Sequence, residues 1–433
     1  MSMEYIETIE LTKIVGGGQA IGTLKNGQKC FVWGGLPGEN VEVRLTKKKS
    51  KLSEAIVERV ISPSPDRIDP HNPESYLSTS PWQIMSFAAE QLYKSQLVAE
   101  AFELHGVTLP SQPEIYSDHT EYGYRNKIEF SWFGDTDTIS GVDMLDLAFF
   151  RRGSRGKVAV DGTSLARPEI NKLAREIRDL LRTKPITARN LKTLIIRCDQ
   201  RGSCVWQLYL KDEIQDLVSE TEANKLPAQG GEIIFSNPKS PASVITKRLA
   251  AFGDITLTDT LIDVPFRYSA ESFFQINLPI YQRTLGDIAK WIDCREVVDM
   301  YSGVGTIGLT IGGEKVTLVE INEYAVREMR RNIDDLDKKA SAILAASESA
   351  LDYITPDKTI IVDPPRAGLH TNVVDQLLEV LPPRIIYLSC NPVTQARDIA
   401  KLLDKYQIAH HTGYNFFPRT PHIENLVVID KIN

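Results

Sequence analysis

From residue 261 onward the chain repeats one pattern, in which an apolar strand ends in a polar residue and leads into a turn or helix. Four segments show it: "EVVDMYSGVGTIGLTI", "KVTLVEINEYAVREMRRNI", "KTIIVDPPRAGL" and "RIIYLSCNP". Strands that alternate with helices in this way form a mostly parallel sheet with helices on both faces. We therefore predict a doubly wound α/β domain over residues 261–433.

Ligands of such sheets bind beyond the carboxyl ends of the strands, and in this sequence reactive side chains occupy those ends. The four residues are Asp299, Glu320, Asp363 and Cys390. The pattern predicts one binding site at this edge of the sheet.

The first of these turns, "YSGVGTIG", contains Gly303 and Gly305, and an acid, Glu320, follows at the end of the next strand. Two glycines alone are also explained by a tight turn. The acid is placed to bind ribose hydroxyls, as in dinucleotide sites. Because the third glycine of the dinucleotide motif is missing, S-adenosylmethionine fits better than a nicotinamide cofactor.

The segment "VDPPR" sets Asp363 before Pro364 and a second proline at a strand end. Prolines leave backbone carbonyl groups without strand partners, and these can face a pocket and hold a flat, amide-rich ring. The segment is similar to the D/N-P-P-Y/F motif with which nucleic-acid methyltransferases hold the target base. A rigid turn without a ligand is the alternative.

The N-terminal 62 residues contain five short alternating runs divided by glycine-rich turns, which predict a small barrel of the oligonucleotide-binding type. The basic run at 47–51 suits a phosphate contact and a solvated turn equally. Residues 63–260 are expected to form a linker and an α+β domain that binds RNA, and a helix over 82–106 is expected to pack on the catalytic domain.

Several longer motifs occur in one order: "GGGQAIGTLKNGQKCFVWGGLPGENVEV", "YRNKIEF", "SFFQINLPIY", "DMYSGVGTIGL", "IIVDPPRAGL", "IIYLSCNPVTQARDI" and "FFPRTPHIENLVVI". Over nearly its whole length the chain resembles the S-adenosylmethionine-dependent RNA (uracil-C5)-methyltransferases that carry an N-terminal TRAM domain. The resemblance implies a multidomain protein: a five-stranded OB-like barrel, a central α+β domain and a C-terminal Rossmann-like class I methyltransferase domain.

The resemblance also implies roles for single residues. Cys390 is the expected nucleophile and Glu424 the expected base. The expected donor-site residues are Gln275, Tyr301, Gly303, Glu320 and Asp363. The expected contacts to the flipped uracil are Phe273, Asp363 and Pro364. Arg125 and Lys127 are candidates for phosphate contacts, although at alternate positions of a strand they suit a solvated face equally.

The cysteine has a chemical reason to be there, because C5 of uracil is too weak a nucleophile to take a methyl group directly. A thiolate that adds to C6 turns the ring into an enolate whose C5 can attack. A polar strand end is expected to favour the thiolate, and Asn391 and Pro392 are expected to end the strand. Glu424 then removes the C5 proton. A buried, inert thiol and an exposed edge acid are the alternatives.

Many relatives bind an iron–sulfur cluster after the barrel, but here "HNPESYLSTSPWQIMSF" contains no cysteine. No cluster and no metal site are expected, and the junction is expected to be held by packing alone. The five cysteines, including Cys294, are scattered without a C-x-x-C pair, so we expect reduced thiols.

A net charge of −7 means that RNA must be met by local basic patches. No apolar run could span a membrane and "MSMEYIETIELTK" lacks a signal peptide, so a cytoplasmic monomer is expected. The predicted activity is uracil-C5 methylation, with 23S ribosomal RNA slightly preferred over the tRNA T-loop. The rivals are a cytosine-C5 enzyme and a non-catalytic RNA-binding protein with a degenerate methyltransferase fold.

Overall fold

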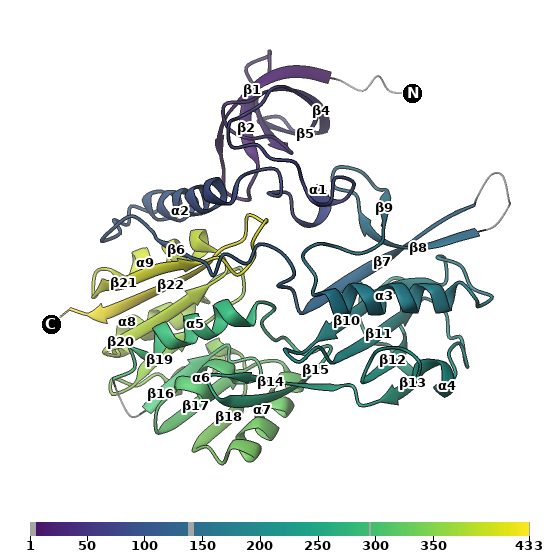
Figure 1. Cartoon of the computed structure of the whole chain (residues 1–433). Helices are drawn as coiled ribbons and strands as arrows, with labels where there is room; N and C mark the ends of the chain where they lie inside the picture. Colours follow the sequence, from purple (N-terminus) through teal and green to yellow (C-terminus); the bar gives the residue numbers. More distant parts are fainter. Residues whose placement is uncertain (1–5, 137–142, 294–295, 433) are drawn as a thin grey trace. The chain divides into compact units, whose positions relative to one another are not determined.

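The computed structural model describes residues 6–136, 143–293 and 296–432, and the chain divides into two compact units (Figure 1). The first unit consists of Met1–Glu90, Thr120–Leu257 and Arg419–Pro421. The second consists of Gln91–His119, Thr258–Pro418 and His422–Asn433. Neither unit is one continuous stretch of sequence. Cys294 lies outside the described residues.

The first unit begins with a closed five-stranded barrel in the order β1-β2-β3-β5-β4. Its strands are β1 (Ile6–Ile14), β2 (Ala20–Thr23), β3 (Lys29–Trp33), β4 (Asn40–Lys48) and β5 (Leu52–Ser62). Alternate apolar side chains such as Leu11, Val32 and Val43 are fully buried inside it, as the period of two requires. The predicted barrel is confirmed.

The segment after the barrel carries a short helix, α1 (Tyr76–Thr79), and is held by polar contacts. Arg67 Nη2 donates a 2.7 Å hydrogen bond to Glu39, whose side chain is fully buried. Asn72 Oδ1 accepts a hydrogen bond from the backbone N–H of Ser164 at 3.1 Å and another from the Ser164 hydroxyl. The expectation that packing alone secures this junction is therefore wrong, because side-chain hydrogen bonds also hold it.

The first unit also contains a seven-stranded sheet in the order β13-β12-β11-β10-β7-β8-β9. Its elements are β7 (Lys127–Thr136), β8 (Asp143–Phe150), β9 (Lys157–Val160), α3 (Pro168–Leu181), β10 (Leu191–Cys198), β11 (Cys204–Leu210), α4 (Glu220–Ala223), β12 (Gly230–Phe235) and β13 (Lys247–Gly253). Leu173 and Ile177 of α3 are buried in one core with Phe130 and Trp132 of β7. The buried residues of α3 recur at helical spacing along one face, as in an amphipathic helix that packs on a sheet.

Arg419 completes the first unit from a distant part of the sequence. Its backbone N–H donates to Glu90 Oε2 at 3.0 Å, and its Nη1 donates to the carbonyl of Met85 at 2.6 Å. The guanidinium also pairs with Glu121 and lies 5.5 Å from the ring centroid of Tyr122. A side chain that is 3% exposed is thus surrounded by opposite charge.

The second unit is built on an eight-stranded sheet in the order β18-β17-β16-β19-β20-β22-β21-β6. Its strands are β6 (Ile115–Tyr116), β16 (Glu296–Met300), β17 (Lys315–Glu320), β18 (Ala340–Leu344), β19 (Thr359–Val362), β20 (Arg384–Ser389), β21 (Tyr406–Tyr414) and β22 (Glu424–Lys431). Strands β16 to β20 are parallel, and β22 runs antiparallel between β20 and β21. A hairpin, β14 (Thr256–Leu261) and β15 (Val264–Ser269), precedes them.

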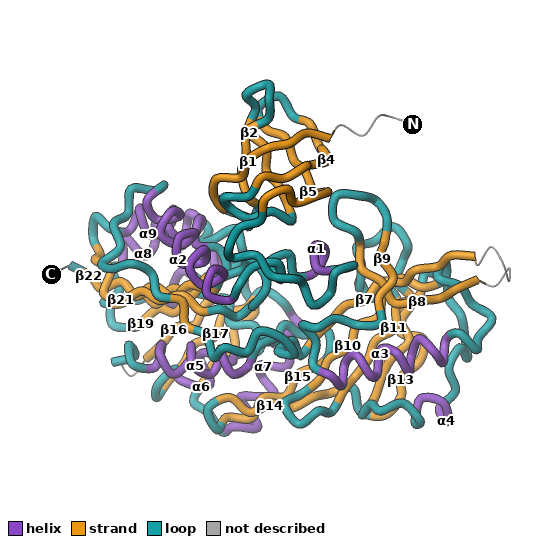
Figure 2. Tube along the Cα trace, turned by 45° about the horizontal axis from the view of Figure 1, so that its top comes forward, coloured by secondary structure: helices purple, strands orange, loops and turns teal. Residues whose placement is uncertain are grey.

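Helices cover both faces of this sheet, with α2, α8 and α9 on one side and α5, α6 and α7 on the other (Figure 2). Their bounds are α2 (Phe87–Glu103), α5 (Leu278–Ala289), α6 (Thr306–Ile311), α7 (Glu323–Leu336), α8 (Thr371–Val380) and α9 (Pro392–Leu402), with short turns at η1 (Ser347–Ser349) and η2 (Leu351–Tyr353). Val98 and Phe102 of α2 are buried in the core of the second unit. The predicted multidomain fold with a doubly wound sheet is confirmed. Within the described ranges, no helix combines the length and apolar character of a membrane span.

Candidate active site

The carboxyl ends of β17, β16, β19 and β20 lie side by side at one edge of the sheet, because these strands are parallel neighbours. The predicted residues follow from this register. Glu320 ends β17, Tyr301 follows β16, Asp363 follows β19 and Cys390 follows β20. The structure thus brings together four side chains that are up to about 90 residues apart in sequence.

The turn after β16 requires an unusual backbone. Tyr301, Gly303 and Gly305 have φ values of 66°, 57° and 87°, in the left-handed region that favours glycine. The N–H of Gly303 donates to Glu320 Oε2 at 2.9 Å, and the N–H of Asn322 donates to Glu320 Oε1 at 2.7 Å. An added Cβ at Gly303 would meet no atom within 4 Å, so the turn faces open space that a ligand can fill.

Asp299 lies one step further back, inside β16, and is fully buried. Its Oδ2 accepts a 2.9 Å hydrogen bond from the N–H of Gly308, while its Oδ1 has no hydrogen-bond partner among the described residues. Burial raises its pKa to about 8, despite the Gly308 hydrogen bond. Asp299 is therefore a buried acid that supports the turn through its hydrogen bond from Gly308.

This raised pKa predicts that the protein becomes less stable as pH rises. The unfolded Asp299 ionises near 3.8 and the folded one near 8, so the free energy of unfolding falls between those values. We expect urea to unfold the wild type at a lower concentration at about pH 9 than at about pH 5. The difference should shrink in Asp299→Asn, and an equal difference in both proteins would contradict the assignment.

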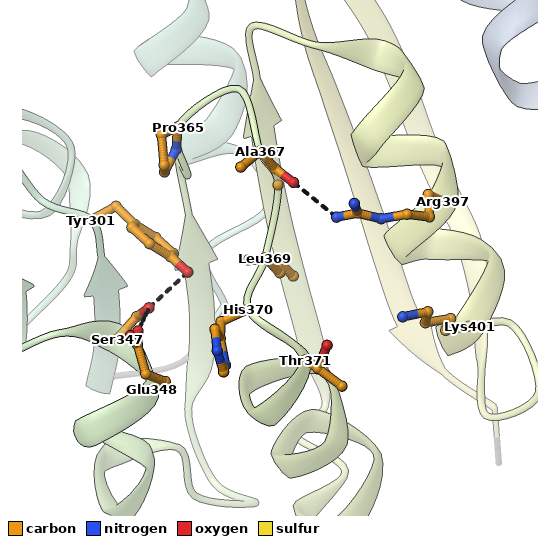
Figure 3. A pocket seen from close by; sticks show the side chains of 11 residues that line it. Tyr301, Ser347, Glu348, Pro365, Ala367, Leu369, His370, Thr371, Arg397 and Lys401 are labelled. Carbon is orange, nitrogen blue, oxygen red and sulfur yellow. Dashed lines mark hydrogen bonds between the residues drawn. The ribbon is translucent and has the colours of Figure 1, made fainter.

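A pocket of about 390 Å³ opens beside Tyr301 (Figure 3). Ser347 Oγ donates to the Tyr301 hydroxyl at 2.7 Å, and Glu348 lies next to it. On the far side Arg397 Nη2 donates to the carbonyl of Ala367 at 2.9 Å. Sequence reasoning missed Ser347 and Glu348. Their position after β18 could have indicated them, but the half-buried strand "ASAIL" is a weak strand pattern.

Tyr301 also borders a second hollow, which is lined by Phe273, Gln275, Gly303 and Asp363 among others. The two phenylalanines of "SFFQ" differ in their burial. Phe274 is 3% exposed and stacks on Tyr268 with ring centroids 4.1 Å apart, whereas Phe273 is 69% exposed. The exposed ring is therefore the one that can contact a ligand.

Cys390 and Glu424 are brought together by the antiparallel pairing of β20 with β22. Ser389 pairs with Asn425, so the next step along the two chains sets Cys390 opposite Glu424. The strand ends at Ser389, and Asn391 caps α9 by accepting a 3.2 Å hydrogen bond from the N–H of Val393. Pro392 is the first helical residue, where its missing N–H costs nothing.

The electrostatics of this cluster differ from the expectation for the thiol. Burial and the nearby Glu424 and Asp363 raise the pKa of Cys390 to about 11, and Arg366 only partly opposes them. Burial likewise raises the pKa of Asp363 to about 7 and that of Glu424 well above its usual value. The expectation that this strand end favours the thiolate is wrong for the protein without ligands, because burial of the thiol and, after it, two nearby carboxyl groups raise its pKa.

A fully buried lysine, Lys94 of α2, holds the segment that follows β21. Its Nζ donates to Asn415 Oδ1 at 2.6 Å and to the carbonyl of Phe417 at 3.1 Å. Asn277 Nδ2 donates to the carbonyl of Phe416 at 3.1 Å. These contacts fix the stretch that leads towards Glu424, and no local sequence pattern had indicated them.

Three further residues were predicted to contact the RNA: Pro364, Arg125 and Lys127. Pro364 is buried directly after Asp363. Arg125 and Lys127 are half-buried in the first unit, where the N–H of Arg125 donates to Leu165 O at 2.9 Å. Their phosphate contacts stay a prediction. In the part of the chain that the structure describes, no group of three or more His, Cys, Asp or Glu residues is placed to hold a metal ion.

Comparison with known families decides the class of protein. The family described as tRNA (Uracil-5-)-methyltransferase matches residues 92–432, and the TRAM domain matches residues 8–57. The chain belongs to the tRNA (uracil-5-)-methyltransferase family. It is thus an RNA methyltransferase with an N-terminal TRAM domain.

Relatives cover the whole chain of this uracil-5-methyltransferase family member. An uncharacterized RNA methyltransferase of Fusobacterium nucleatum is 27% identical over 460 residues, which span 100% of this chain and 97% of the relative. One from Lactobacillus johnsonii is 29% identical over 476 residues, with 100% and 99% covered. The structure of Pyrococcus abyssi tRNA (uracil-54, C5)-methyltransferase with S-adenosyl-L-homocysteine has a TM-score of 0.79 at 22% identity and covers 97% of this chain and 100% of that one. This last likeness shows the shared fold.

Proposed function

We propose that the enzyme methylates C5 of a uridine in RNA, with Cys390 as the nucleophile and Glu424 as the base. The observation that carries this proposal is the register of β20 and β22, which sets a thiol opposite a buried carboxyl. Asp363 adjoins both groups, since it contributes to the raised pKa of each.

The donor site is assigned to the two hollows on either side of Tyr301. Glu320 still has lone pairs for ribose hydroxyls beyond the two backbone N–H groups from which it already accepts, and Gly303 leaves room for the ligand. Gln275 and Asp363 line the second hollow. When bound, S-adenosylmethionine supplies an electrophilic methyl group. Its positive sulfonium charge would favour the thiolate form of Cys390, against the effect of the nearby carboxyl groups.

The proposed chemistry moves two protons. Cys390 must lose its thiol proton before it adds to C6, and Asp363, with a pKa of about 7, is the carboxylate that can accept this proton near neutral pH. Arg366 favours the charged forms of Cys390 and Glu424. After methyl transfer, Glu424 takes the C5 proton, the C5–C6 double bond re-forms, and the Cys390 thiolate leaves.

The target uracil must leave its stack to reach the sulfur, and the exposed ring of Phe273 is the proposed contact for the flipped base. Pro364 holds the turn after Asp363 rigid beside it. Flipping costs least from a single-stranded loop, where the base is already unstacked.

The RNA itself stays a prediction, with 23S ribosomal RNA first and the tRNA T-loop second. The description of the matching family and the likeness in fold to a tRNA (uracil-54, C5)-methyltransferase support the tRNA alternative. Mass mapping of 5-methyluridine in both RNAs, from cells with and without the gene, tests the proposal. Loss of a single 5-methyluridine identifies the substrate, and loss of 5-methylcytidine instead would overturn the uracil assignment.

Glu320→Gln provides a test of the donor site. An amide offers one acceptor oxygen where the carboxylate offers two, so its NH₂ group would face a backbone N–H of Gly303 or Asn322. Losing charge-assisted hydrogen bonds of about 1.5–3 kcal/mol should weaken S-adenosylmethionine binding roughly ten- to a hundredfold in calorimetry. Glu323→Gln, on an exposed residue of α7, is the matched control. Equal affinities in both variants would remove Glu320 from the site.

A further inference from the structure

We propose that the enzyme binds single-stranded RNA on a basic surface of the first unit formed by two turns. The surface consists of the β4–β5 turn at 47–51 and the β8–β9 segment at 150–157, and we call it the two-turn surface. The inference rests on the proposed RNA substrate and adds a surface of the first unit that binds the strand. It also places a second basic segment, at 150–157, beside the basic run at 47–51.

The two turns adjoin although about a hundred residues separate them in sequence. Gly153, at the tip of the second turn, has a φ of 72°, and an added Cβ would lie 2.2 Å from Ile56 Cδ1 and 3.0 Å from Thr46 Cγ2. Thr46 directly precedes the basic run. Only glycine permits this approach, so the sequence is built to bring the second turn against the barrel.

Arg152 fixes the second turn in place. Its Nε donates to the carbonyl of Leu77 at 2.6 Å, its backbone N–H donates to Ser78 Oγ at 3.2 Å, and its guanidinium carbon lies 4.0 Å from the ring centroid of Trp33. Burial lowers its pKa from the usual value. Arg152 therefore has a structural role, and its exposed neighbours Arg151 and Arg155 are the residues that can bind a ligand.

The charges of the two-turn surface have one sign. Residues 47–51 and 150–157 contain no Asp or Glu, and their cations are Lys47, Lys48, Lys49, Lys51, Arg151, Arg152, Arg155 and Lys157. Arg151 and Arg155 are exposed and form no ion pair with any residue that the structure describes. One acid, Glu54, lies beside the lysines, 4.0 Å from Lys47 Nζ and 3.5 Å from Lys49 Nζ. Such a surface on a chain of net charge −7 indicates a polyanionic partner.

An exposed aromatic ring decides which polyanion fits. Phe150 is 64% exposed at the base of the second turn, and Lys157 Nζ lies 5.0 Å from its ring centroid. Sites for single-stranded nucleic acid combine cations that follow the phosphates with aromatic rings on which bases stack. Every nucleotide of a single strand carries both a phosphate for the cations and a base for the ring, so RNA matches both features of the surface.

Three variants test the surface in the full-length enzyme: the pair Arg151→Ala, Arg155→Ala, the pair Lys48→Ala, Lys49→Ala, and Phe150→Ala. The control pair, Lys338→Ala and Lys339→Ala, removes two exposed cations from the second unit. The probe is a fluorescein-labelled RNA hairpin with a uridine loop, whose binding is followed by fluorescence anisotropy over a series of salt concentrations.

Each pair of cations should reduce the slope of log affinity against log salt by about 1.4, since each phosphate contact to a single strand contributes about 0.7. Phe150→Ala should weaken binding roughly tenfold and leave the slope unchanged, because stacking releases no counterions. The control pair should bind as the wild type does. Wild-type affinity and slope in all three variants would overturn the surface, and so would tighter binding of poly-glutamate than of RNA.

The failure of this inference can be told apart from that of the proposed function. A covalent adduct of the wild type with 5-fluorouridine RNA reports the chemistry alone. If the adduct forms and the three variants keep wild-type affinity, the proposal that RNA binds the two-turn surface is wrong, and the proposed methyl transfer is retained. If the variants lose affinity and no adduct forms, the surface stands and the proposed chemistry fails.

Discussion

We expect Cys390→Ala to retain less than about one per cent of the wild-type rate of methyl transfer, while S-adenosylmethionine binds with almost unchanged affinity. The thiol acts on C6 of the uracil and does not hold the donor, so its loss removes the covalent step alone. The substitution should fold, because Cys390 is only half-buried and follows the end of β20. Transfer of a labelled methyl group to RNA and calorimetric titration of the donor measure the two quantities.

The matched control for this variant is Cys204→Ala, which removes a thiol buried in the core of the first unit. It should keep most of the activity. Turnover of Cys390→Ala above roughly one per cent, with donor affinity intact, would show that another group activates the ring.

We expect Glu424→Gln to transfer the methyl group and then stall with RNA covalently attached. Burial and Asp363 raise the pKa of Glu424 well above its usual value, so the fold tolerates an uncharged group here, and an amide of the same shape should fold and bind as well as the acid does. Only removal of the C5 proton needs the carboxylate. Its loss should lower turnover roughly a hundred- to ten-thousandfold. Denaturing electrophoresis should show a slowly migrating band that carries the methyl label.

Two controls test whether that band is RNA attached through Cys390. It should disappear in the Cys390→Ala, Glu424→Gln double variant, because the sulfur is the point of attachment. RNA with 5-fluorouridine at the target should trap the wild type in the same way, since fluorine cannot leave as a cation. Normal turnover by Glu424→Gln, or no band from a folded and donor-bound variant, would assign the base to another residue.

Short sequence patterns correctly predicted the features of this enzyme that depend on short segments alone. The alternation within the barrel strands and the polar residues after β16, β17 and β19 could be read directly, because period and strand ends are properties of short segments. The meeting of Cys390 with Glu424 was predicted only through the family resemblance. It depends on β22 entering antiparallel beside β20, a pairing that no short window of sequence encodes.

Effects that depend on three-dimensional burial could not be predicted from the sequence. The thiol of Cys390 was expected to ionise easily, but the carboxyl groups that oppose its ionisation lie 27 and 34 residues away in sequence and adjoin it only in the fold. Ser347 was missed because half-buried residues at the sheet edge weaken the alternation of β18. The contacts of Lys94 were not predicted, since its partners come from beyond β21.

The place of Arg419 in the first unit has a consequence for protein synthesis. A ribosome makes residues 1–90 and 120–257 well before Arg419–Pro421. The first unit is therefore complete only when nearly all of the chain has been synthesised and Arg419 can pair with Glu90 and Glu121. Domains that are continuous in sequence fold one after another as they emerge. Here both units must be completed at nearly the same moment, which leaves an interrupted translation product without a finished unit and open to cellular proteases.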